Sequence, residues 1–377
     1  MTTSAPTSRT VALVANSAWN LWNFRRGLIV ALLKDGHAVH LLGPPGPEQA
    51  DLTALGATYH ALRHFERSGH NPLRDLALTR ELRAVFRAVG VEVCLLYTVK
   101  AVIYGSFAAR LTGARAVATL TGLGYAFIHG GRTNRLVRWL YRRALRYADR
   151  VLFHNADDLA LFVDDGLVPA AKAGTVPGSG LPLADYAPTG YERAEPGLFL
   201  FVGRLLADKG VREFVAAARL LRRRRPDLRC AVLGPLDPGN PAAVTAAEFA
   251  AWTAENIITY YGPTDDVRPF ITAASAVVLP SYREGCPRVL LEAGALGRAV
   301  VGTDVPGVRQ VIADGETGRL VPVRDAAALA TVLEELADRP ALLAAYGVAG
   351  RRRVGALFSE GRVVGVYRGL VRQSFDR

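Results

Sequence analysis

The chain has 377 residues, of which 50% are hydrophobic and 21% charged, and its formal net charge is +12. This length allows two domains of ordinary size, and the composition is that of a globular protein, which excludes a disordered chain. The longest run without Asp, Glu, Lys or Arg is the 16 residues from Ala116 to Gly131, which glycines interrupt. No membrane-spanning segment is therefore predicted.

The positive charge is concentrated in the first part of the chain. Residues 1–150 hold 20 Lys and Arg against 8 Asp and Glu, whereas residues 151–377 hold 26 of each kind. This asymmetry suggests an anionic partner for the first part, such as nucleic acid, acidic lipid or a phosphorylated substrate. A surface that serves only solubility is the alternative.

The three cysteines, Cys94, Cys230 and Cys286, are scattered and show no metal or redox spacing. They indicate a reducing compartment and no disulfide framework. The apolar run from Val11 to Ala15 is too short for a signal peptide. We therefore expect a cytoplasmic protein, or one attached to a membrane only from outside.

Short apolar segments alternate with helical ones along the first half. A strand that begins at Thr10 is followed by a polar loop with Asn16 and Ser17, a helix over 24–37 and a second strand. This alternation predicts a parallel sheet covered by helices on both faces. The pattern recurs in the segments 92–98, 102–113, 115–122, 150–155 and 156–167.

The composition changes over 177–198. This segment is rich in Pro, Gly and Ala, shows no periodicity and is typical of a linker. Strands and helices then alternate again. We therefore expect two Rossmann-like α/β domains facing each other across a cleft, residues 1–184 and 185–357. A C-terminal helix over 358–377 is expected to join the first domain.

Candidate binding residues follow the strands of the second domain, because ligands of open parallel sheets bind beyond the carboxyl ends of the strands. In "VGRLLADKG", Gly203 ends a strand, and Arg204 and Lys209 lie five positions apart in the loop that follows. A flexible glycine beside two cations is suited to bind a diphosphate. Taken alone, the segment is better interpreted as a solvated basic loop.

The segment "PSYREGCPRVLLEA" supplies two unequal carboxylates. Pro287 fits the first turn of a helix, which leaves the N–H groups of Gly285 and Cys286 near its positive end. Glu284, just before that end, can accept hydrogen bonds from a sugar. Glu292 lies among apolar residues, where an unpaired charge is costly, so a ribose diol or an ion pair with a nearby Arg is expected.

These motifs resemble those of the family 4 glycosyltransferases, which have the GT-B fold. The likeness lies in "GRLLADKGVREF", "LPSYREGCPRVLLEAGALGRAVVGTDVPGVRQVI" and "DGETGRLVPVRD", and in that family a Glu-x7-Glu pair marks the donor half. Four first-half segments resemble the enzymes that add the second sugar to polyprenyl-diphosphate-linked oligosaccharides. These segments are "NFRRGLIVALL", "ERSGHNPLRDL", "YGSFAARLTG" and "TGLGYAFI".

The resemblance implies roles for the donor-side residues. Arg204 and Lys209 would neutralise the leaving nucleotide diphosphate, and Glu284 would hold the transferred sugar. The remaining expected contacts to the UDP-sugar are Gly203, Gly262, Thr264, Gly285, Cys286, Pro287 and Glu292, with Glu292 on the ribose. It also implies a retaining transfer, in which the leaving phosphate helps deprotonate the acceptor and positioning replaces a dedicated nucleophile.

Two departures from the family pattern limit these roles. Thr121 stands where many members carry a His, and Thr cannot act as a base at neutral pH. Gln310 replaces a later acidic residue, so a third carboxylate is not expected to help. Because no Asp-x-Asp motif occurs, we expect neither a metal nor any cofactor beyond the UDP-sugar substrate.

The acceptor is expected on the first domain, with Asn16, Arg67, Asn71 and Thr121 as contacts. Residues 132–150 predict an amphipathic helix whose basic stripe fits an anionic membrane surface. The alternative is a solvated face that binds nothing. The stripe consists of Arg135, Arg138, Arg142 and Arg146, with Trp139 in the same arc, and Leu136, Val137, Leu140 and Tyr141 on the opposite, core-facing side. We therefore expect the protein at the inner face of the plasma membrane.

Two other functions stay open. A GT-B nucleotide-sugar 2-epimerase would share the donor motifs. A basic nucleic-acid-binding protein would explain the charge, but the chain has no recognisable nucleic-acid-reading motif, and nucleic acid is not expected as a partner. A dinucleotide dehydrogenase is disfavoured, because no Gly-x-Gly-x-x-Gly follows the first strand.

Overall fold

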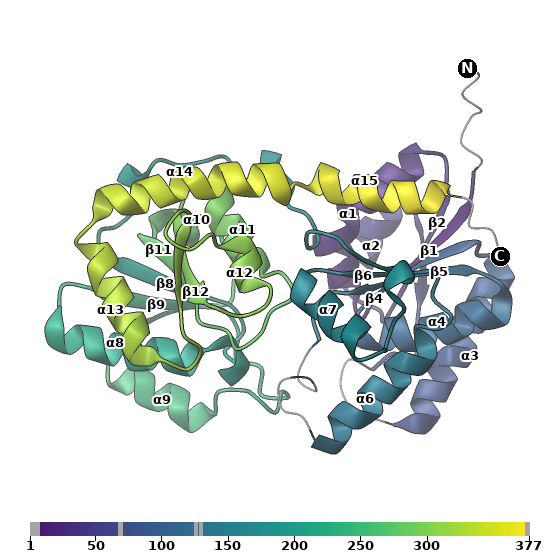
Figure 1. The fold of residues 1–377 in the computed structure, drawn as a ribbon, viewed down its shortest axis with the longest axis horizontal. Helices are drawn as coiled ribbons and strands as arrows, with labels where there is room; N and C mark the ends of the chain where they lie inside the picture. Colours follow the sequence, from purple (N-terminus) through teal and green to yellow (C-terminus); the bar gives the residue numbers. More distant parts are fainter. Residues whose placement is uncertain (1–7, 67–70, 124–126, 128–130, 374–377) are drawn as a thin grey trace. The chain divides into compact units, whose positions relative to one another are not determined.

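The structure is a computed structural model that describes residues 8–66, 71–123, 127 and 131–373. The chain divides into two compact units: unit 1 comprises Met1–Gly180 and Glu360–Arg377, and unit 2 comprises Leu181–Ser359. Each unit contains a parallel sheet packed against helices (Figure 1). The expected α/β fold with two Rossmann-like domains is therefore confirmed.

Unit 1 holds a seven-stranded parallel sheet in the order β3-β2-β1-β4-β5-β6-β7. Because chain order reverses between the neighbours β1 and β4, the loops that follow these strands diverge and leave room for a ligand. The strands are β1 (Thr10–Val14), β2 (Ala38–Gly43), β3 (Thr58–Ala61), β4 (Val93–Tyr97), β5 (Arg115–Leu120), β6 (Arg150–Phe153) and β7 (Ala173–Thr175).

The two faces of this sheet bury different sets of side chains, since neighbouring residues of a strand point to opposite faces. From β1, Ala12 and Val14 belong to one core cluster, and Val11 and Leu13 belong to another. The described helices are α1 (Ala18–Lys34), α2 (Gln49–Ala54), α3 (Pro72–Val89), α4 (Val99–Thr112), α6 (Gly131–Ala144), α7 (Ala156–Asp164) and α15 (Glu360–Arg372). Helices α3, α4, α6 and α7 contribute to the first cluster, and α1, α2 and α15 to the second.

Helix α1 begins at Ala18, six residues earlier than the apolar periodicity predicts. The side chain of Ser17 accepts a hydrogen bond from the N–H of Asn20 at 3.1 Å and so caps the helix. The inner face of α1 carries Leu21, Arg25 and Leu28, which are all buried. An arginine is thus placed where only apolar residues are expected.

Helix α15 lies beside α1 on the same side of the unit 1 sheet (Figure 1). Its residues Val363, Tyr367 and Val371, four positions apart, are buried, and each such side chain is worth about 1.5–3 kcal/mol. The hydroxyl groups of Tyr367 and Thr119 lie 3.0 Å apart. The C-terminal helix is therefore an integral part of the unit 1 core.

Unit 2 holds a six-stranded parallel sheet in the order β10-β9-β8-β11-β12-β13. Its strands are β8 (Leu198–Val202), β9 (Arg229–Leu233), β10 (Thr259–Gly262), β11 (Ala276–Leu279), β12 (Ala299–Thr303) and β13 (Gly318–Val321). Its helices are α8 (Val211–Arg224), α9 (Ala246–Ala254), α10 (Arg268–Ala273), α11 (Arg288–Ala295), α12 (Val308–Val311), α13 (Ala326–Ala337) and α14 (Pro340–Leu357). Leu181, Tyr186 and Phe358 belong to its core, so the segment expected as a linker packs against unit 2.

Candidate functional site

The donor-side residues lie at the carboxyl edge of the unit 2 sheet, where two strand ends approach closely. Gly203 follows β8, and its N–H donates to the carbonyl of Leu233 at 2.9 Å. Gly234 follows β9 with φ +142°, and a Cβ there would lie 2.0 Å from the carbonyl oxygen of Gly203. Only glycine fits at position 234. The close contact between the backbones at Gly203 and Gly234 fixes the start of the loop that carries Arg204 and Lys209.

Arg204 and Lys209 have different partners in the structure. The guanidinium of Arg204 is exposed and forms an ion pair with Asp237 at 2.7 Å. Lys209 is half-buried, and its Nζ lies 2.6 Å from Oε1 of Glu284. Each of the two cations predicted for one diphosphate is therefore paired with a carboxylate. Only Lys209 of the two is paired with Glu284, the carboxylate expected to hold the sugar.

Glu284 lies in the loop after β11, where polar contacts hold its carboxylate. Its Oε1 accepts a hydrogen bond from Ser281 Oγ at 2.7 Å as well as the one from Lys209, and its own N–H donates to the carbonyl of Pro306 at 3.3 Å. Ser281 is buried, and its carbonyl accepts from the hydroxyl of Thr303. Sequence reasoning missed Ser281, although its place directly after a buried strand and Pro280 is typical of a site residue.

The helix start that follows differs slightly from expectation. Helix α11 begins at Arg288, and Pro287 is the N-cap residue, with φ −72° and ψ 111°. The prediction of Pro287 inside the first turn was thus wrong by one residue, because its extended ψ ends the preceding loop. Burial raises the pKa of the Cys286 thiol to about 12, so this thiol is neutral and not a nucleophile.

Glu292 lies on α11, and its residue is 9% exposed. Its Oε1 accepts from the hydroxyl of Tyr186 at 2.8 Å and from Nε of Arg288 at 2.9 Å. Burial, and then the neighbouring carboxylate, raise the pKa of Tyr186 to about 12, so this hydroxyl stays a donor. The structure thus contains the ion pair considered as the alternative for Glu292, and adds Tyr186, which the sequence did not single out.

The segment expected near the nucleotide base follows β10. Gly262 has φ +77°, and a Cβ there would meet nothing within 4 Å. Thr264 is exposed, and its Oγ1 accepts the N–H of Asp266 at 3.1 Å, which closes a short turn. The segment is therefore an open, hydrogen-bonded turn whose backbone can contact a planar ligand.

The residues expected to contact the acceptor belong to unit 1. Asn16 follows β1 and Thr121 follows β5, both partly buried at the carboxyl edge of the sheet. Asn71 caps helix α3, because its Oδ1 accepts from the N–H groups of Leu73 at 3.1 Å and Arg74 at 3.3 Å. Arg67 lies outside the described residues.

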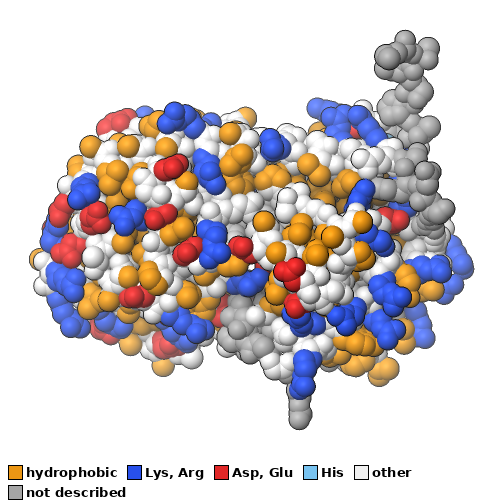
Figure 2. Space-filling model, viewed as in Figure 1, with side chains coloured by type: hydrophobic (Ala, Val, Ile, Leu, Met, Phe, Trp, Pro, Cys, Tyr) orange, Lys and Arg blue, Asp and Glu red, His pale blue; other side chains and the backbone are white. Residues whose placement is uncertain are grey.

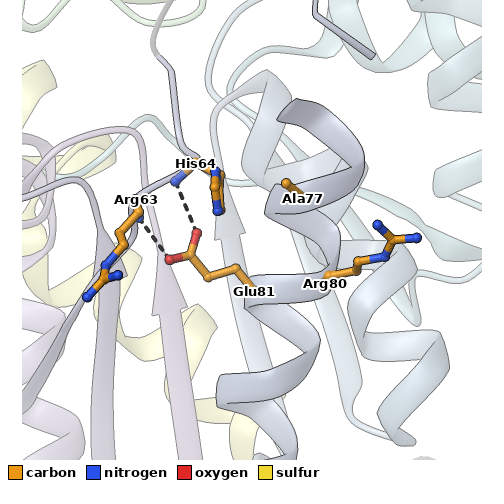
Figure 3. A pocket seen from close by; sticks show the side chains of 5 residues that line it. All are labelled: Arg63, His64, Ala77, Arg80 and Glu81. Carbon is orange, nitrogen blue, oxygen red and sulfur yellow. Dashed lines mark hydrogen bonds between the residues drawn. The ribbon is translucent and has the colours of Figure 1, made fainter. Parts of the chain in front are cut away.

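A shallow pocket of about 490 Å³ lies between the loop after β3 and helix α3. The two carboxylate oxygens of Glu81 accept from the backbone N–H groups of Arg63 at 2.8 Å and His64 at 3.1 Å (Figure 3). The side chain of Arg80 points away from this carboxylate (Figure 3), and Arg63 and Arg80 are both exposed. Glu81 therefore holds the loop after β3 in place and is not available as a catalytic acid. The exposed charged groups at the pocket are the guanidinium groups of Arg63 and Arg80.

Helix α6 is shorter than the expected 132–150 helix, and its predicted core face is partly wrong. Val137 and Tyr141 are buried as expected, but Leu136, which was expected in the core, is 48% exposed. Trp139, expected beside the basic stripe, is 54% exposed. The guanidinium of Arg143 lies over the Trp139 ring at 5.4 Å. Basic and hydrophobic side chains gather over α6 on the face seen in Figure 2.

Part of the basic stripe on α6 has partners within unit 1. Arg138 forms an ion pair with Asp165, and Arg142 donates to the carbonyl of the same residue at 2.8 Å. Arg135 and Arg146 are exposed. The stripe therefore combines anchored and exposed cations beside exposed aromatic and aliphatic side chains.

Comparison with known proteins identifies the class. Residues 196–339 match the family described as "Glycosyl transferases group 1", and residues 21–179 match the "Glycosyl transferase 4-like domain". Anabaena HepE in complex with UDP and glucose has the same fold, with a TM-score of 0.80 and 16% identity, over 97% of this chain and 100% of that one. The chain belongs to the family 4 glycosyltransferases and has the GT-B fold, as the sequence motifs predict.

Two curated relatives illustrate the range of acceptors. A D-inositol 3-phosphate glycosyltransferase of Arthrobacter sp. (strain FB24) is 39% identical over 166 residues, which are 43% of this chain and 38% of the relative. The chain thus matches about two fifths of that relative's length. The N,N'-diacetylbacillosaminyl-diphospho-undecaprenol alpha-1,3-N-acetylgalactosaminyltransferase of Campylobacter jejuni is 25% identical over 333 residues, which are 84% of this chain and 86% of the relative.

Two further findings concern the described part of the chain. Within it, no helix has the length and apolar character needed to cross a bilayer. No group of three or more His, Cys, Asp or Glu side chains among these residues is placed to hold a metal ion.

Proposed function

We propose that the protein is a retaining glycosyltransferase that moves a hexose or N-acetylhexosamine from a UDP-sugar to a polyprenyl-diphosphate-linked saccharide, in the assembly of a surface polysaccharide or glycan. The observation that carries this proposal is the contact of Lys209 with Glu284 at 2.6 Å, with Ser281 on the same carboxylate oxygen. A cation for the leaving diphosphate and a carboxylate for the sugar are thus held side by side at the edge of one sheet.

Each donor-side group then has a distinct task. Lys209 and Arg204 stabilise the negative charge that develops on UDP as the glycosidic bond breaks. Glu284, kept in place by Ser281, accepts hydrogen bonds from hydroxyl groups of the transferred sugar. Both bonds to Glu292 reach Oε1, so Oε2 is the oxygen proposed to accept from the ribose.

No protein nucleophile is required in this mechanism. The proposal is that the leaving phosphate takes the proton of the attacking acceptor hydroxyl on the same face of the sugar, while the residues above supply position and charge. The neutral Cys286 thiol does not compete for this role. We expect chelation by EDTA to leave the rate unchanged, because no metal is invoked.

The comparisons support the two substrates to different degrees. HepE is described in complex with UDP and glucose, which supports a UDP-sugar donor. The Campylobacter relative is named for a diphospho-undecaprenol acceptor, and the Arthrobacter relative for an inositol phosphate. Both acceptors carry phosphate, and the longer match to the Campylobacter relative favours the lipid-linked one.

We further propose that the protein is cytoplasmic and docks on the inner face of the plasma membrane through α6. The exposed Leu136 and Trp139 beside Arg135 and Arg143 suit an anionic headgroup layer. Vesicles containing phosphatidylserine should bind the protein at low salt and release it at 0.5 M salt, where charges act over roughly 4 Å instead of about 10 Å. Binding that is absent at every salt concentration would remove the membrane proposal.

One experiment tests the activity directly. A panel of UDP-sugars is incubated with lipid-diphosphate mono- and disaccharides, and products are identified by mass. A single UDP-sugar and acceptor pair should give a product heavier by one sugar residue. A new UDP-sugar formed from UDP-GlcNAc alone would instead establish the epimerase, and retention on heparin without nucleotide-sugar binding would favour the nucleic-acid-binding alternative.

A further inference from the structure

Arg25 is a buried cation without an anion. It lies on the inner face of α1, is 2% exposed, and its guanidinium stacks on the ring of Tyr97 at 3.8 Å. Its Nε has no hydrogen-bond partner, and no ion pair of Arg25 occurs among the described residues. Burying an unpaired charge costs several kcal/mol, which a stacked ring offsets only in part.

Arg298 shows how this chain satisfies a buried arginine that has a structural role. Its guanidinium donates to the carbonyl oxygens of Thr272 at 2.6 Å, Thr189 at 2.9 Å and Gly190 at 3.1 Å. The cation thus ties helix α10, which contains Thr272, to the segment before β8 that contains Thr189 and Gly190. Arg25 has no such set, so a structural role does not explain its burial.

Other buried polar groups without partners end the strands around Arg25. His154 follows β6, and its Nε2 has no hydrogen-bond partner in the described structure; Thr98 follows β4, and Asn16 follows β1. Burial, and then the charge of Arg25, lower the pKa of His154 to about 3, so His154 is neutral at physiological pH. Thr98 has φ +73°, a strained conformation for a β-branched residue.

These groups share one edge of one sheet. Strands β1 and β4 are hydrogen-bonded neighbours, and β5 separates β4 from β6. The long side chain of Arg25 leans toward the start of α1, and therefore toward this carboxyl edge. As whole residues Asn16 and Thr98 are only partly buried, although Oδ1 of Asn16 and Oγ1 of Thr98 are themselves buried, so this edge lies close to solvent.

We propose that Arg25 is the base of an anion-binding pocket in unit 1 that takes a phosphoryl group, with Asn16, Thr98 and His154 as hydrogen-bonding groups around it. A phosphoryl group accepts several hydrogen bonds at once and supplies the missing negative charge. Its assignment to the diphosphate of the lipid-linked acceptor rests on the proposed function. The binding of the anion itself does not.

The test compares Arg25→Met with Arg26→Met, an exposed arginine one position away on the same helix. Thermal unfolding of the full chain is followed with inorganic pyrophosphate as the probe, at saturating UDP so that the donor side is occupied. Pyrophosphate should raise the Tm of the wild type and of Arg26→Met, but not that of Arg25→Met. Arg25→Lys, which keeps the charge but not the planar fork, should retain part of the shift.

The same variants separate this inference from the proposed function. In transfer assays Arg25→Met should raise the KM for the lipid-linked acceptor about tenfold and leave the KM for the UDP-sugar within about twofold. An Arg25-dependent Tm shift without transfer to any lipid-linked acceptor would keep the anion pocket and reject the proposed acceptor. An equal pyrophosphate shift in wild type and Arg25→Met, or destabilisation of both Arg25 variants with equal changes in both KM values, would overturn the pocket.

Discussion

Nζ of Lys209 and Oε1 of Glu284 lie 2.6 Å apart, although 75 positions separate them in the chain. Lys209 ends the 3-10 turn Ala207–Lys209 after β8, and Glu284 lies in the loop after the neighbouring strand β11. Because β8 and β11 are parallel, their carboxyl ends meet at one edge and bring the two side chains together. A bound diphosphate would therefore compete with Glu284 for the lysine.

Replacement of Glu284 tests the sugar-binding role. Glu284→Gln keeps the size of the side chain but removes its charge, so we expect kcat to fall by about 10²-fold or more, while the Kd for UDP changes by less than about threefold. Steady-state kinetics and calorimetric titration with UDP measure the two effects. The control is Glu255→Gln, because Glu255 is exposed and pairs with Arg219 away from the site; full turnover in Glu284→Gln would show that the donor-site assignment is wrong.

Glu292 is expected to act on the nucleotide instead. Glu292→Gln should weaken UDP binding about tenfold, since a charged acceptor of ribose hydroxyls becomes a neutral amide. Tyr186→Phe is the matched control, because it removes one bond to Oε1 and leaves the carboxylate in place. Calorimetry should show a smaller loss for Tyr186→Phe; equal losses would mean that the carboxylate only supports the local packing.

The sheets could be predicted from the sequence because their strands are short, apolar and regularly spaced. The beginning of α1 could not, since its first turns carry Trp19, Asn20 and Asn23, and apolar periodicity becomes clear only after them. For Leu136 of α6, helical periodicity alone predicts a core position, which is wrong. Its exposure depends on where neighbouring elements end, which a periodic pattern does not contain.

The site residues show the same limit. Glu284 and Lys209 could be proposed because glycines, charges and strand ends coincide in short motifs. Tyr186 could not, since it lies in a Pro- and Gly-rich stretch and reaches Glu292 from 106 positions away. The sequence does not predict the unpaired guanidinium of Arg25 either, because only the folded structure shows which groups surround it.

Gly210 and Gly262 form a matched pair for testing the loop that carries Lys209. Both have positive φ, +73° and +77°, but a Cβ on Gly210 would lie 2.0 Å from the carbonyl oxygen of Pro280, whereas one on Gly262 would meet nothing within 4 Å. Gly210→Ala should cost about 3 kcal/mol or more of unfolding free energy, and Gly262→Ala about 1 kcal/mol. Urea unfolding measures both, and equal costs would show that the loop relaxes around the added methyl group.

The last prediction concerns Asp35, which joins α1 to α15. It follows the end of α1, is almost buried, and pairs with Arg368 and, at 3.2 Å, with Arg372. The hydrogen bonds from Arg368 hold the pKa of Asp35 below its ordinary value of 3.8. Because the folded state lowers this pKa, the contribution to stability is present above the unfolded pKa and is lost as the pH falls through the lower, folded one.

Asp35→Asn should therefore lower the free energy of unfolding on the order of 1 kcal/mol at pH 7, given that both arginines are partly exposed. The difference from the wild type should shrink below about pH 4 and vanish at pH values below the folded pKa of the aspartate. Urea unfolding at pH 7, 5, 4 and 3 measures this, with Asp304→Asn as the control, since Asp304 forms an exposed ion pair with Arg309 in unit 2. A difference that stays constant down to pH 3 would mean that Asp35 stabilises α15 through packing or neutral hydrogen bonds and not through its charge.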